Sequence, residues 1–249
     1  MKPRLVAETE SYAVVYKPPF MHTAPLREGE KGTLLDWFGA VFPPVLKLEG
    51  RKKIEGGLVH RLDFETEGLT LIAKKQDFLD AFLLRREKEL FVKEYGAIVS
   101  PPGGQTLPGF PPPPPFSPLI ESGFRPYGRG RKTVRPLTGK TEGKETDEKV
   151  YRTEILESTE LDGARKYLRL RIQRGFRHQI RCHLAWIGAP ILYDPLYRTD
   201  YRIGAENGAE RKNLALRCEV LAFADLSGVK REYRISPLIR DYSVKAGGS

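Results

Sequence analysis

The alternation of apolar and polar positions along the chain predicts short strands separated by two helices. Tyr12–Tyr16 (YAVVY) and Leu69–Ala73 (LTLIA) are apolar runs of strand length bounded by turn residues, which is typical of buried strands. In Tyr167–Ile172 the apolar residues alternate with Arg169 and Arg171, which indicates a half-buried strand with one basic face. Further strands are predicted at Glu94–Val99, Tyr151–Leu156, Asn213–Phe223 and about Arg231–Ile235.

Two segments have the period of an amphipathic helix. The first is predicted from Phe78 to about Leu90, with Asp77 as its cap, and the second from about Arg177 to Ile187. Their apolar faces hold Leu79, Phe82, Leu83 and Leu90 in the first, and Ile180, Leu184 and Ile187 in the second. Strands outnumber helices and no regular βαβ alternation occurs. The pattern therefore predicts an α+β fold with a mixed, largely antiparallel sheet and flanking helices.

Length and charge narrow the class of protein. The 249 residues suit a single domain spanning residues 1–249, and a hydrophobic content of 40% indicates a globular chain. We expect a cytoplasmic protein, because no apolar run is long enough to span a membrane and the N-terminus lacks a signal-peptide core. The net charge of +10 favours a polyanionic partner, most simply nucleic acid. The alternative is a basic protein that binds nothing anionic.

An insertion at about residues 101–150 departs from the rest of the chain in composition. Eleven of the 20 prolines lie between Pro101 and Pro136, and five are consecutive at Pro111–Pro115. Such a run favours an extended polyproline conformation, so we predict a surface excursion. A polyproline ligand for a partner domain is the alternative. Residues 140–149 carry dense charge of mixed sign and are candidates for disorder.

The same insertion contains a basic segment, Gly123–Pro136, with five Lys and Arg residues among glycines. We interpret it as a flexible cationic loop in which Arg129, Arg131 and Lys132 contact RNA phosphates. Tyr127 adds a surface on which a base could stack. The alternative is a loop that is only solvated.

Several chemistries lack their motifs. Cys182 and Cys218 are far apart and outside any C-x-x-C pair, so neither a disulfide framework nor a zinc site is expected. The chain has no G-x-S-x-G and no phosphate-binding glycine motif before a helix, so no nucleotide cofactor is expected. Asp63, Glu65 and Glu67 are the nearest candidates for a metal nuclease, but they alternate in a loop, which is weak evidence for a metal.

Asp63 can instead act with an arginine. Arg177 and Arg181 are four residues apart on the predicted second helix and would share a face, with Arg174 nearby. A neighbouring guanidinium keeps a carboxylate ionised and oriented, and such a carboxylate is a usable nucleophile. An ordinary structural salt bridge is the alternative, and spacing alone does not decide between the two.

Five segments, in order, resemble the RluA-type family of RNA pseudouridine synthases. They are YAVVYKPPFMHTAP, GLVHRLDFETEGLTLIAK, VKEYGAIV, GFRHQIRCHLAWIGAPILYDPLYR and NLALRCEVLAF. The second resembles the family's H-R-L-D-x-x-T-S-G-L signature, and the fourth contains H-Q-I-R-x-H. The matches span about Val6 to Phe223. Because they begin so near Met1, we expect no N-terminal S4 RNA-binding domain.

The resemblance implies roles for individual residues. Asp63 would be the nucleophile, and Tyr95 would pack on the target base and help to remove the C5 proton. Arg181 would pair with Asp63. Arg61 would fill the space left by the extruded nucleotide, and His60 would support the loop, next to the substrate.

The chain also departs from the family's pattern at several positions. The departures are Pro19 for glycine in K-P-P-F, Glu67 for serine, Phe176 for arginine, Tyr193 for glycine and Arg217 for histidine. Arg177, directly after Phe176, is a candidate replacement for the missing arginine and hence a substrate-binding residue. These departures bear on substrate choice more than on activity.

The resemblance implies an enzyme that isomerises uridine in structured RNA, rRNA or tRNA, without metal or cofactor. The target nucleotide must leave its stack to reach the carboxylate, and phosphate contacts would offset that cost. One rival hypothesis is an inactive RNA-binding protein or RNA chaperone of the same fold, and another is a metal-dependent nuclease. We expect a monomer with no membrane partner.

Overall fold

The computed structural model describes residues 1–88, 90–100, 107–115, 117–138, 149–161, 164–198 and 212–242. The chain divides into two compact units. The first comprises Met1–Tyr95 and Arg217–Pro237, and the second comprises Gly96–Leu216 and Leu238–Ser249. A single domain over residues 1–249 therefore stays a prediction.

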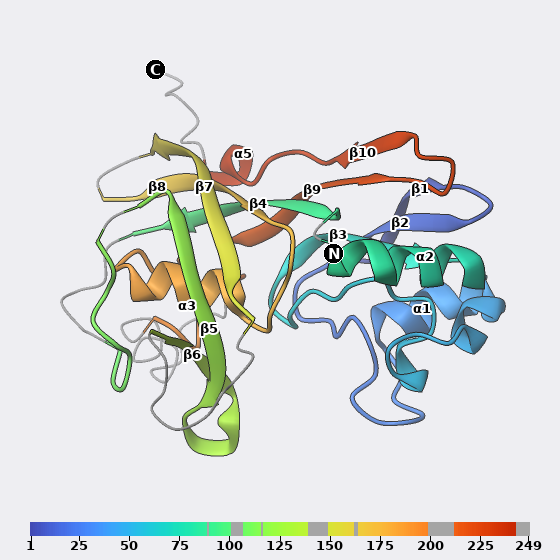
Figure 1. The fold of residues 1–249 in the computed structure, drawn as a ribbon, viewed down its shortest axis with the longest axis horizontal. Helices are drawn as coiled ribbons and strands as arrows, with labels where there is room; N and C mark the ends of the chain where they lie inside the picture. The colour runs from blue at the N-terminus through green and yellow to red at the C-terminus, as the bar shows by residue number, and fades with distance from the viewer. Residues whose placement is uncertain are drawn as a thin grey trace. The chain divides into compact units, whose positions relative to one another are not determined.

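The first unit is built on strands that are far apart in sequence (Figure 1). Its strands are β1 (Arg4–Glu8), β2 (Tyr12–Lys17), β3 (Glu67–Ala73), β9 (Leu216–Ala224) and β10 (Lys230–Arg234). β1–β2, β2–β3 and β9–β10 pair antiparallel, whereas β3 and β9 pair parallel. Every residue of β2 and β3 is buried, which explains why both read as continuous apolar runs. The mixed, largely antiparallel sheet is confirmed.

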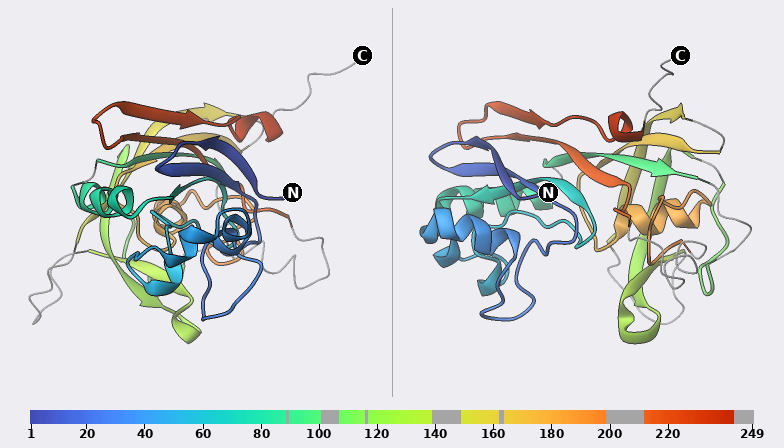
Figure 2. Two further views of the ribbon diagram at one scale, coloured as in Figure 1. Left: turned by 90° about the vertical axis from the view of Figure 1, so that its right-hand side faces the viewer. Right: turned by 180° about the vertical axis from the view of Figure 1, so that it is seen from behind.

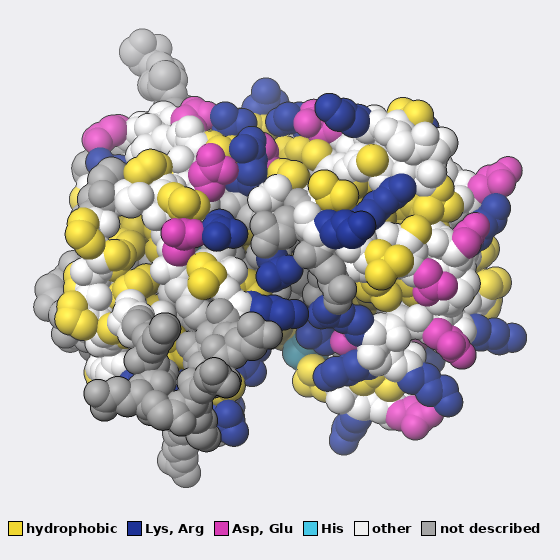
Figure 3. All heavy atoms as spheres, viewed as in Figure 1, with side chains coloured by type: hydrophobic (Ala, Val, Ile, Leu, Met, Phe, Trp, Pro, Cys, Tyr) yellow, Lys and Arg dark blue, Asp and Glu magenta, His cyan; other side chains and the backbone are white. Residues whose placement is uncertain are grey.

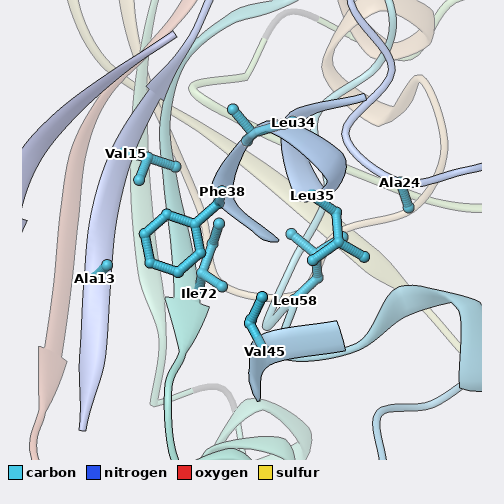
Figure 4. Packing of buried hydrophobic residues seen from close by; sticks show 9 residues of the cluster. All are labelled: Ala13, Val15, Ala24, Leu34, Leu35, Phe38, Val45, Leu58 and Ile72. Carbon is cyan, nitrogen blue, oxygen red and sulfur yellow. The ribbon is translucent and has the colours of Figure 1, made fainter. Parts of the chain in front are cut away.

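Short helices pack against these strands. They are α1 (Leu34–Val41), α2 (Gln76–Glu87) and the 3₁₀ turns Pro43–Lys47 and Lys53–Glu55. Thr33 caps α1, because its side chain accepts a hydrogen bond from the amide of Asp36 at 3.1 Å. Phe38 of α1 reaches toward Ala13 and Val15 of β2 in the core shown in Figure 4. This core fixes one side of the segment that leads to Asp63.

Helix α2 differs in detail from its prediction. It begins at Gln76, so Asp77 lies in its first turn and accepts a hydrogen bond from the adjacent amide of Phe78 instead of capping the helix. The predicted face is buried at Leu79 and Phe82, but Leu90 lies beyond the helix and is exposed. The prediction that Leu90 belongs to the buried face was wrong, because the helix ends before the periodic pattern does.

The second unit contains most of the hairpin strands. They are β5 (Leu119–Tyr127), β6 (Thr133–Leu137), β7 (Tyr151–Glu160) and β8 (Lys166–Ile172), and β4 (Val92–Val99) begins in the first unit and continues into the second. β5 pairs antiparallel with both β6 and β7, and β7 pairs antiparallel with β8. The helices are α3 (Gln179–Trp186) and α5 (Ile239–Tyr242).

The basic segment Gly123–Pro136 is not a flexible loop, and that prediction was wrong. It forms the β5–β6 hairpin, with a 3₁₀ turn at Arg129–Arg131 as its tip (Figures 1 and 2). Glycine and proline are poor strand formers, so local propensity hides the strand. Pairing with β7 stabilises β5 as a strand, although its local sequence does not favour one.

The polyproline run is bound by its own chain. The indole Nε1 of Trp186 in α3 lies 3.1 Å from the carbonyl oxygens of both Pro111 and Pro112. Phe110, just before the run, packs with Tyr197 in a small apolar cluster that also contains Val134 of β6. This part of the insertion is therefore docked on the second unit. Residues 140–148, part of the segment expected to be disordered, lie outside the described residues.

The basic face predicted for β8 exists, but it is largely neutralised. Arg169 and Arg171 form ion pairs with Glu157 and Glu154 of β7 at 3.2 and 3.4 Å. These cross-strand pairs leave little net positive charge on the strand for RNA. Among the described residues, we find no helix long and apolar enough to cross a membrane.

Candidate active site

Asp63 lies in the segment between the Lys53–Glu55 turn and β3, and hydrogen bonds fix this segment on three sides. Leu62 and Thr23 exchange two bonds, from the Thr23 hydroxyl to the Leu62 carbonyl at 2.7 Å and from the Leu62 amide back to that hydroxyl at 3.1 Å. The His60 Nε2 accepts from the Leu71 amide of β3 at 3.1 Å. The Thr66 amide donates to the Asp63 carbonyl at 3.1 Å and closes the turn. His60 thus supports the loop through its unprotonated nitrogen.

Lys17 holds the other side of this loop. It is fully buried, and its ammonium donates to the carbonyls of Pro18 and Met21, both at 2.8 Å, and of Phe64 at 3.3 Å. Burial lowers the pKa of Lys17 to about 7, although the negative charges of Asp63, Glu65 and Glu67 oppose that shift. Lys17 therefore tethers the loop through its backbone carbonyls, and it is a buried cation whose pKa responds to the Asp63 charge.

Tyr95 of β4 lies in the same environment. The Asp63 charge contributes to raising the pKa of the Tyr95 phenol, after burial and the interaction with the Cys218 thiol. Burial also raises the pKa of Cys218 to about 12, so the phenol and the thiol are both neutral. A phenol that resists ionisation can pack on a base or donate a hydrogen bond. The predicted roles of Tyr95, packing on the target base and helping to remove the C5 proton, stay predictions.

Arg61 forms an ion pair with Glu55, which lies in the 3₁₀ turn before it. The Arg61 guanidinium lies 2.6 Å from the Glu55 carboxylate, and it keeps 54% of its side-chain surface exposed while Glu55 is buried. The guanidinium is thus held by Glu55 while the side chain as a whole stays partly exposed. This placement is compatible with the predicted contact with RNA, which stays a prediction.

Two of the departures from the family's pattern contact each other. Glu67, at the start of β3, and Arg217, in β9, are buried and joined by an ion pair of 2.7 Å. The Tyr16 hydroxyl donates to the second carboxylate oxygen of Glu67. Burial, and then the bond to Glu67, raise the pKa of Tyr16. The glutamate in place of serine and the arginine in place of histidine are therefore the two partners of one buried ion pair.

Two other departures occupy left-handed backbone. Tyr193, in place of a glycine, has φ of 62°. In the segment Lys17–Phe20, the left-handed residue is Phe20, with φ of 59°, and proline cannot adopt that conformation. The glycine of the motif K-P-x-G therefore corresponds to Phe20, and its assignment to Pro19 was wrong. Both substitutions carry the strain that glycine avoids.

In the second unit, Arg181 has a carboxylate partner that the sequence analysis did not assign. Its Nε and Nη2 donate to the two oxygens of Asp194, each at 2.9 Å, and both side chains are fully buried. The amides of Leu196 and Tyr197 also donate to Asp194. Burial would raise the pKa of Asp194, but Arg181 and these amides outweigh it and lower the pKa. Asp63 belongs to the first unit, and its pairing with Arg181 stays a prediction.

Arg177 does not share a helical face with Arg181, contrary to the prediction. Helix α3 begins at Gln179, and His178 before it is left-handed with φ of 55°. Arg177 therefore lies before the helix, and a left-handed residue separates it from the helix that carries Arg181. Arg177 is exposed and donates to the backbone carbonyls of Arg131 at 2.8 Å and Thr133 at 3.3 Å, which ties it to the β5–β6 hairpin.

The hairpin tip carries the other predicted RNA contacts. Arg131 and Lys132 are exposed, and Arg129 occupies the first position of the tip. Figure 3 shows Lys and Arg side chains in dark blue over the face drawn, with magenta Asp and Glu side chains interspersed. The hairpin thus presents cations on an ordered scaffold.

The histidine and the cysteine of α3 have protein partners. His183 is buried with its ring nitrogens 2.9 Å from the Thr153 hydroxyl and 3.0 Å from that of Ser122, and burial lowers its pKa to about 3. Cys182 donates to the Val134 carbonyl. The described residues contain no group of three or more His, Cys, Asp or Glu side chains placed to hold a metal ion.

Sequence reasoning missed Lys17, Cys218 and Asp194. Lys17 had a usable signal, since a lysine that ends an apolar strand and precedes proline must find buried acceptors. Asp194 lies within a quoted motif, but only the fold brings it to Arg181. Cys218 had no local signal.

A model of the family described as RNA pseudouridylate synthase matches residues 11–186. Ribosomal large subunit pseudouridine synthase D of Haemophilus ducreyi is 29% identical over 198 residues, covering 78% of this chain and 52% of that protein. Its counterpart from Escherichia coli O6:H1 is 31% identical over 198 residues with the same coverage. The chain thus spans about half the length of these curated relatives.

Two solved structures share the fold. Human RNA pseudouridylate synthase domain containing 1 aligns with a TM-score of 0.64 and 19% identity, covering 94% of this chain and 83% of that one. Human RNA pseudouridylate synthase domain containing 4 aligns with a TM-score of 0.60 and 21% identity, covering 94% and 88%. These likenesses confirm the α+β class. Because the family model covers most of the sequence, the chain belongs to the RNA pseudouridylate synthase family.

Proposed function

We propose that this protein isomerises uridine to pseudouridine in structured RNA, with Asp63 as the nucleophile. The observation that carries the proposal is the placement of Asp63 in a loop fixed by hydrogen bonds, where its charge acts on both Lys17 and Tyr95. A carboxylate held in one orientation beside a buried aromatic residue is suited to attack on a nucleotide whose base stacks on that ring.

The reaction breaks the bond between uracil N1 and C1′, turns the base, and joins C5 to C1′. The C5 proton is lost at the end, and a proton is gained at N1, so the product is an isomer of the substrate. Asp63 acts at C1′, at C6, or as a base that starts elimination; these routes remain alternatives. None of them needs an oxidant, a reductant or a cofactor.

For the substrate, we favour rRNA over tRNA. The proteins similar to this chain carry names that refer to the large ribosomal subunit. The net charge of +10 supports binding to a polyanion, and the exposed cations of the β5–β6 hairpin are the proposed phosphate contacts. His60, Arg61 and Arg177 complete the proposed RNA-binding set. We propose that the protein works as a monomer in the cytoplasm.

The decisive experiment maps pseudouridine chemically in total RNA from cells with and without the gene. A uridine that loses its label in the deletion strain, and regains it with the wild type but not with Asp63→Asn, identifies the substrate. If the map does not change between the two strains in rRNA and tRNA, the proposed activity is wrong in that cell.

The rival function is RNA binding without turnover, as in an RNA chaperone. It predicts that the wild type and Asp63→Asn bind RNA with the same affinity and that both rescue the deletion strain equally. The activity proposal predicts equal affinity but no rescue of modification by Asp63→Asn, so one pair of proteins separates the two hypotheses.

A further inference from the structure

We infer that Glu67 and Arg217 are positioning residues that hold the Asp63 loop and Tyr95 in register with each other. This inference rests on the proposed function, because positioning matters only if Asp63 acts on RNA. It concerns residues of the first unit alone. Neither side chain is assigned to contact substrate.

The first step of the argument is the saturation of the Glu67 carboxylate. One oxygen accepts from Arg217, with Nε at 2.9 Å and Nη2 at 2.7 Å. The other accepts from the Tyr16 hydroxyl. Arg217 also donates to the Ser236 carbonyl at 3.3 Å. One carboxylate thereby joins β2, β3 and β9 inside the unit.

The second step is the position of this cluster relative to Asp63. Glu67 is the first residue of β3 and follows the turn that the Thr66 amide closes on the Asp63 carbonyl. Lys17, one residue after Tyr16, binds the Phe64 carbonyl in that same turn and senses the charges of both Asp63 and Glu67. A shift of Glu67 would therefore move the end of the loop that carries the nucleophile.

The third step connects the cluster to Tyr95. Glu67 and Arg217 are direct partners in the short parallel pairing of β3 with β9, and the next pair is Gly68 and Cys218. A Cβ at Gly68 would collide with the Cys218 backbone, so the strands are in close contact there. Cys218 is also the residue whose thiol, after burial, raises the pKa of the Tyr95 phenol. The ion pair thus holds β3 and β9 together at the point between the Asp63 loop and Tyr95.

Only two residue pairs define this parallel junction. Such a short pairing has few backbone hydrogen bonds, so a buried side-chain bridge contributes a large share of its rigidity. Breaking one partner leaves an uncompensated buried charge, whereas replacing both by neutral side chains of similar shape removes that penalty. The pair is therefore open to a double-substitution test.

The test uses Glu67→Gln, Arg217→Gln and the double variant, with Tyr16→Phe as a milder change that removes one hydrogen bond to Glu67. Single-turnover pseudouridine formation and RNA affinity are measured at a temperature at which each variant stays folded. We expect each single Gln variant to slow turnover by about 10-fold or more, on the scale of lost positioning, with RNA affinity within about 2-fold. The double variant should recover part of the rate.

A second readout does not depend on activity. The chain has two cysteines, and both are buried, so labelling by an aromatic disulfide reagent reports local opening at each. We expect Glu67→Gln to accelerate labelling of Cys218 and to leave Cys182, in the second unit, unchanged. Arg231→Gln is the matched control, because it breaks an ion pair with Asp225 about 25 Å along β9 from Arg217.

The outcomes separate the inference from the function on which it rests. Unchanged turnover in both single variants, or unchanged Cys218 labelling, would overturn the positioning role. A loss of RNA affinity equal to the loss of rate would also overturn it and make Arg217 part of the RNA-binding surface. A wild-type protein without turnover on the mapped RNA would refute the proposed function, and the labelling would still decide whether the bridge closes the junction.

Discussion

At the scale of single residues, the first unit concentrates charges that would be costly if they were unpaired. Lys17, Glu67 and Arg217 are buried, and each is held by hydrogen bonds to backbone or by an ion pair. Buried charges of this kind are tolerated only with such partners. Their contacts fix the two ends of the segment that carries Asp63, so the position of this loop is set by buried side chains.

Asp63→Asn tests the nucleophile directly. The amide has the size of the carboxylate but cannot form the bond to carbon, so we expect pseudouridine formation to fall to background while RNA affinity is kept. The thermal midpoint should stay close to that of the wild type, because the amide fills the same space as the carboxylate. Turnover assays, RNA titration and a melting curve check the three expectations, and residual turnover above background would exclude this mechanism.

Arg181 tests two roles at once. Arg181→Ala leaves Asp194 buried without its cation, so we expect a loss of about 3–5 kcal/mol in the free energy of unfolding. Arg181→Lys keeps a charge but loses the planar fork, and should lose less stability. If Arg181 also orients Asp63, Arg181→Lys should slow single turnovers by at least ~10²-fold.

Asp194→Asn is the matched control for that prediction, because it breaks the same ion pair and retains Arg181. Equal rates for Asp194→Asn and Arg181→Lys would show that the arginine acts only through Asp194. The predicted pairing of Arg181 with Asp63 would then be abandoned.

Lys17 should make stability depend on pH. Its pKa is about 7 in the folded protein against 10.5 as the reference, so above pH 7 the unfolded chain binds more protons at this site. The free energy of unfolding from Lys17 should therefore rise with pH, by at most about 1.4 kcal/mol per unit. Between pH 7 and about 8.5, before unfolded thiols ionise, Lys17→Met should show a shallower slope than the wild type.

The measurement is urea denaturation at several pH values. The protein has two tryptophans, so a Trp186→Phe background leaves Trp37 as the reporter of the first unit. Equal slopes for the two proteins would mean that Lys17 titrates as it does in the unfolded chain.

At the scale of elements, the β5–β6 hairpin is the candidate RNA-binding arm. Arg177 and the Arg135 side chain fasten it, the latter by a bond of 2.6 Å to the Gly109 carbonyl. Replacing Arg129, Arg131 and Lys132 by alanine should weaken RNA binding and reduce the slope of affinity against salt by about one unit per lost contact. Turnover at saturating RNA should be preserved.

A control for the hairpin removes the same charge elsewhere. Lys52, Lys53 and Lys230 are exposed and lie outside the hairpin, and their replacement by alanine lowers the net charge equally. If the slope of RNA affinity against salt falls as much in this control as in the hairpin variant, RNA binding depends on the net charge of the protein and not on the hairpin.

The elements also show what the sequence could predict. Buried strands such as β2 and β3 were predicted closely, because period and composition agree with the tertiary structure. The β5–β6 hairpin was missed because its glycines, prolines and arginines favour a loop locally, and only pairing with β7 makes it a strand. Asp63 and Tyr95 were found through motifs. The partnership of Glu67 with Arg217 was not, because 150 residues separate them and only a parallel pairing brings them together.

At the scale of the whole molecule, the basic chain and the proposed carboxylate nucleophile suggest a reaction that draws on RNA binding and residue positioning alone. In the proposed reaction, the net charge of +10 would attract the phosphate backbone and offset the cost of extracting a nucleotide from its stack. Bond formation by Asp63 needs no Lewis acid. The proposed isomerase therefore differs from a metal-dependent nuclease in that its reaction needs no metal ion.

The last prediction is that turnover survives removal of divalent metal. A short RNA hairpin that folds in monovalent salt is needed, so that loss of Mg²⁺ does not unfold the substrate. With the protein dialysed against EDTA, single-turnover pseudouridine formation should stay within about 2-fold of the rate with Mg²⁺, because the nucleophile is a carboxylate and not a metal-bound water. A denaturing gel of the same samples should show intact RNA throughout. Strand cleavage that appears with Mg²⁺ and vanishes with EDTA would support the nuclease instead. In that case the Arg217→Gln variant, assayed with Mg²⁺, should still cleave RNA, although its pseudouridine formation is expected to fall.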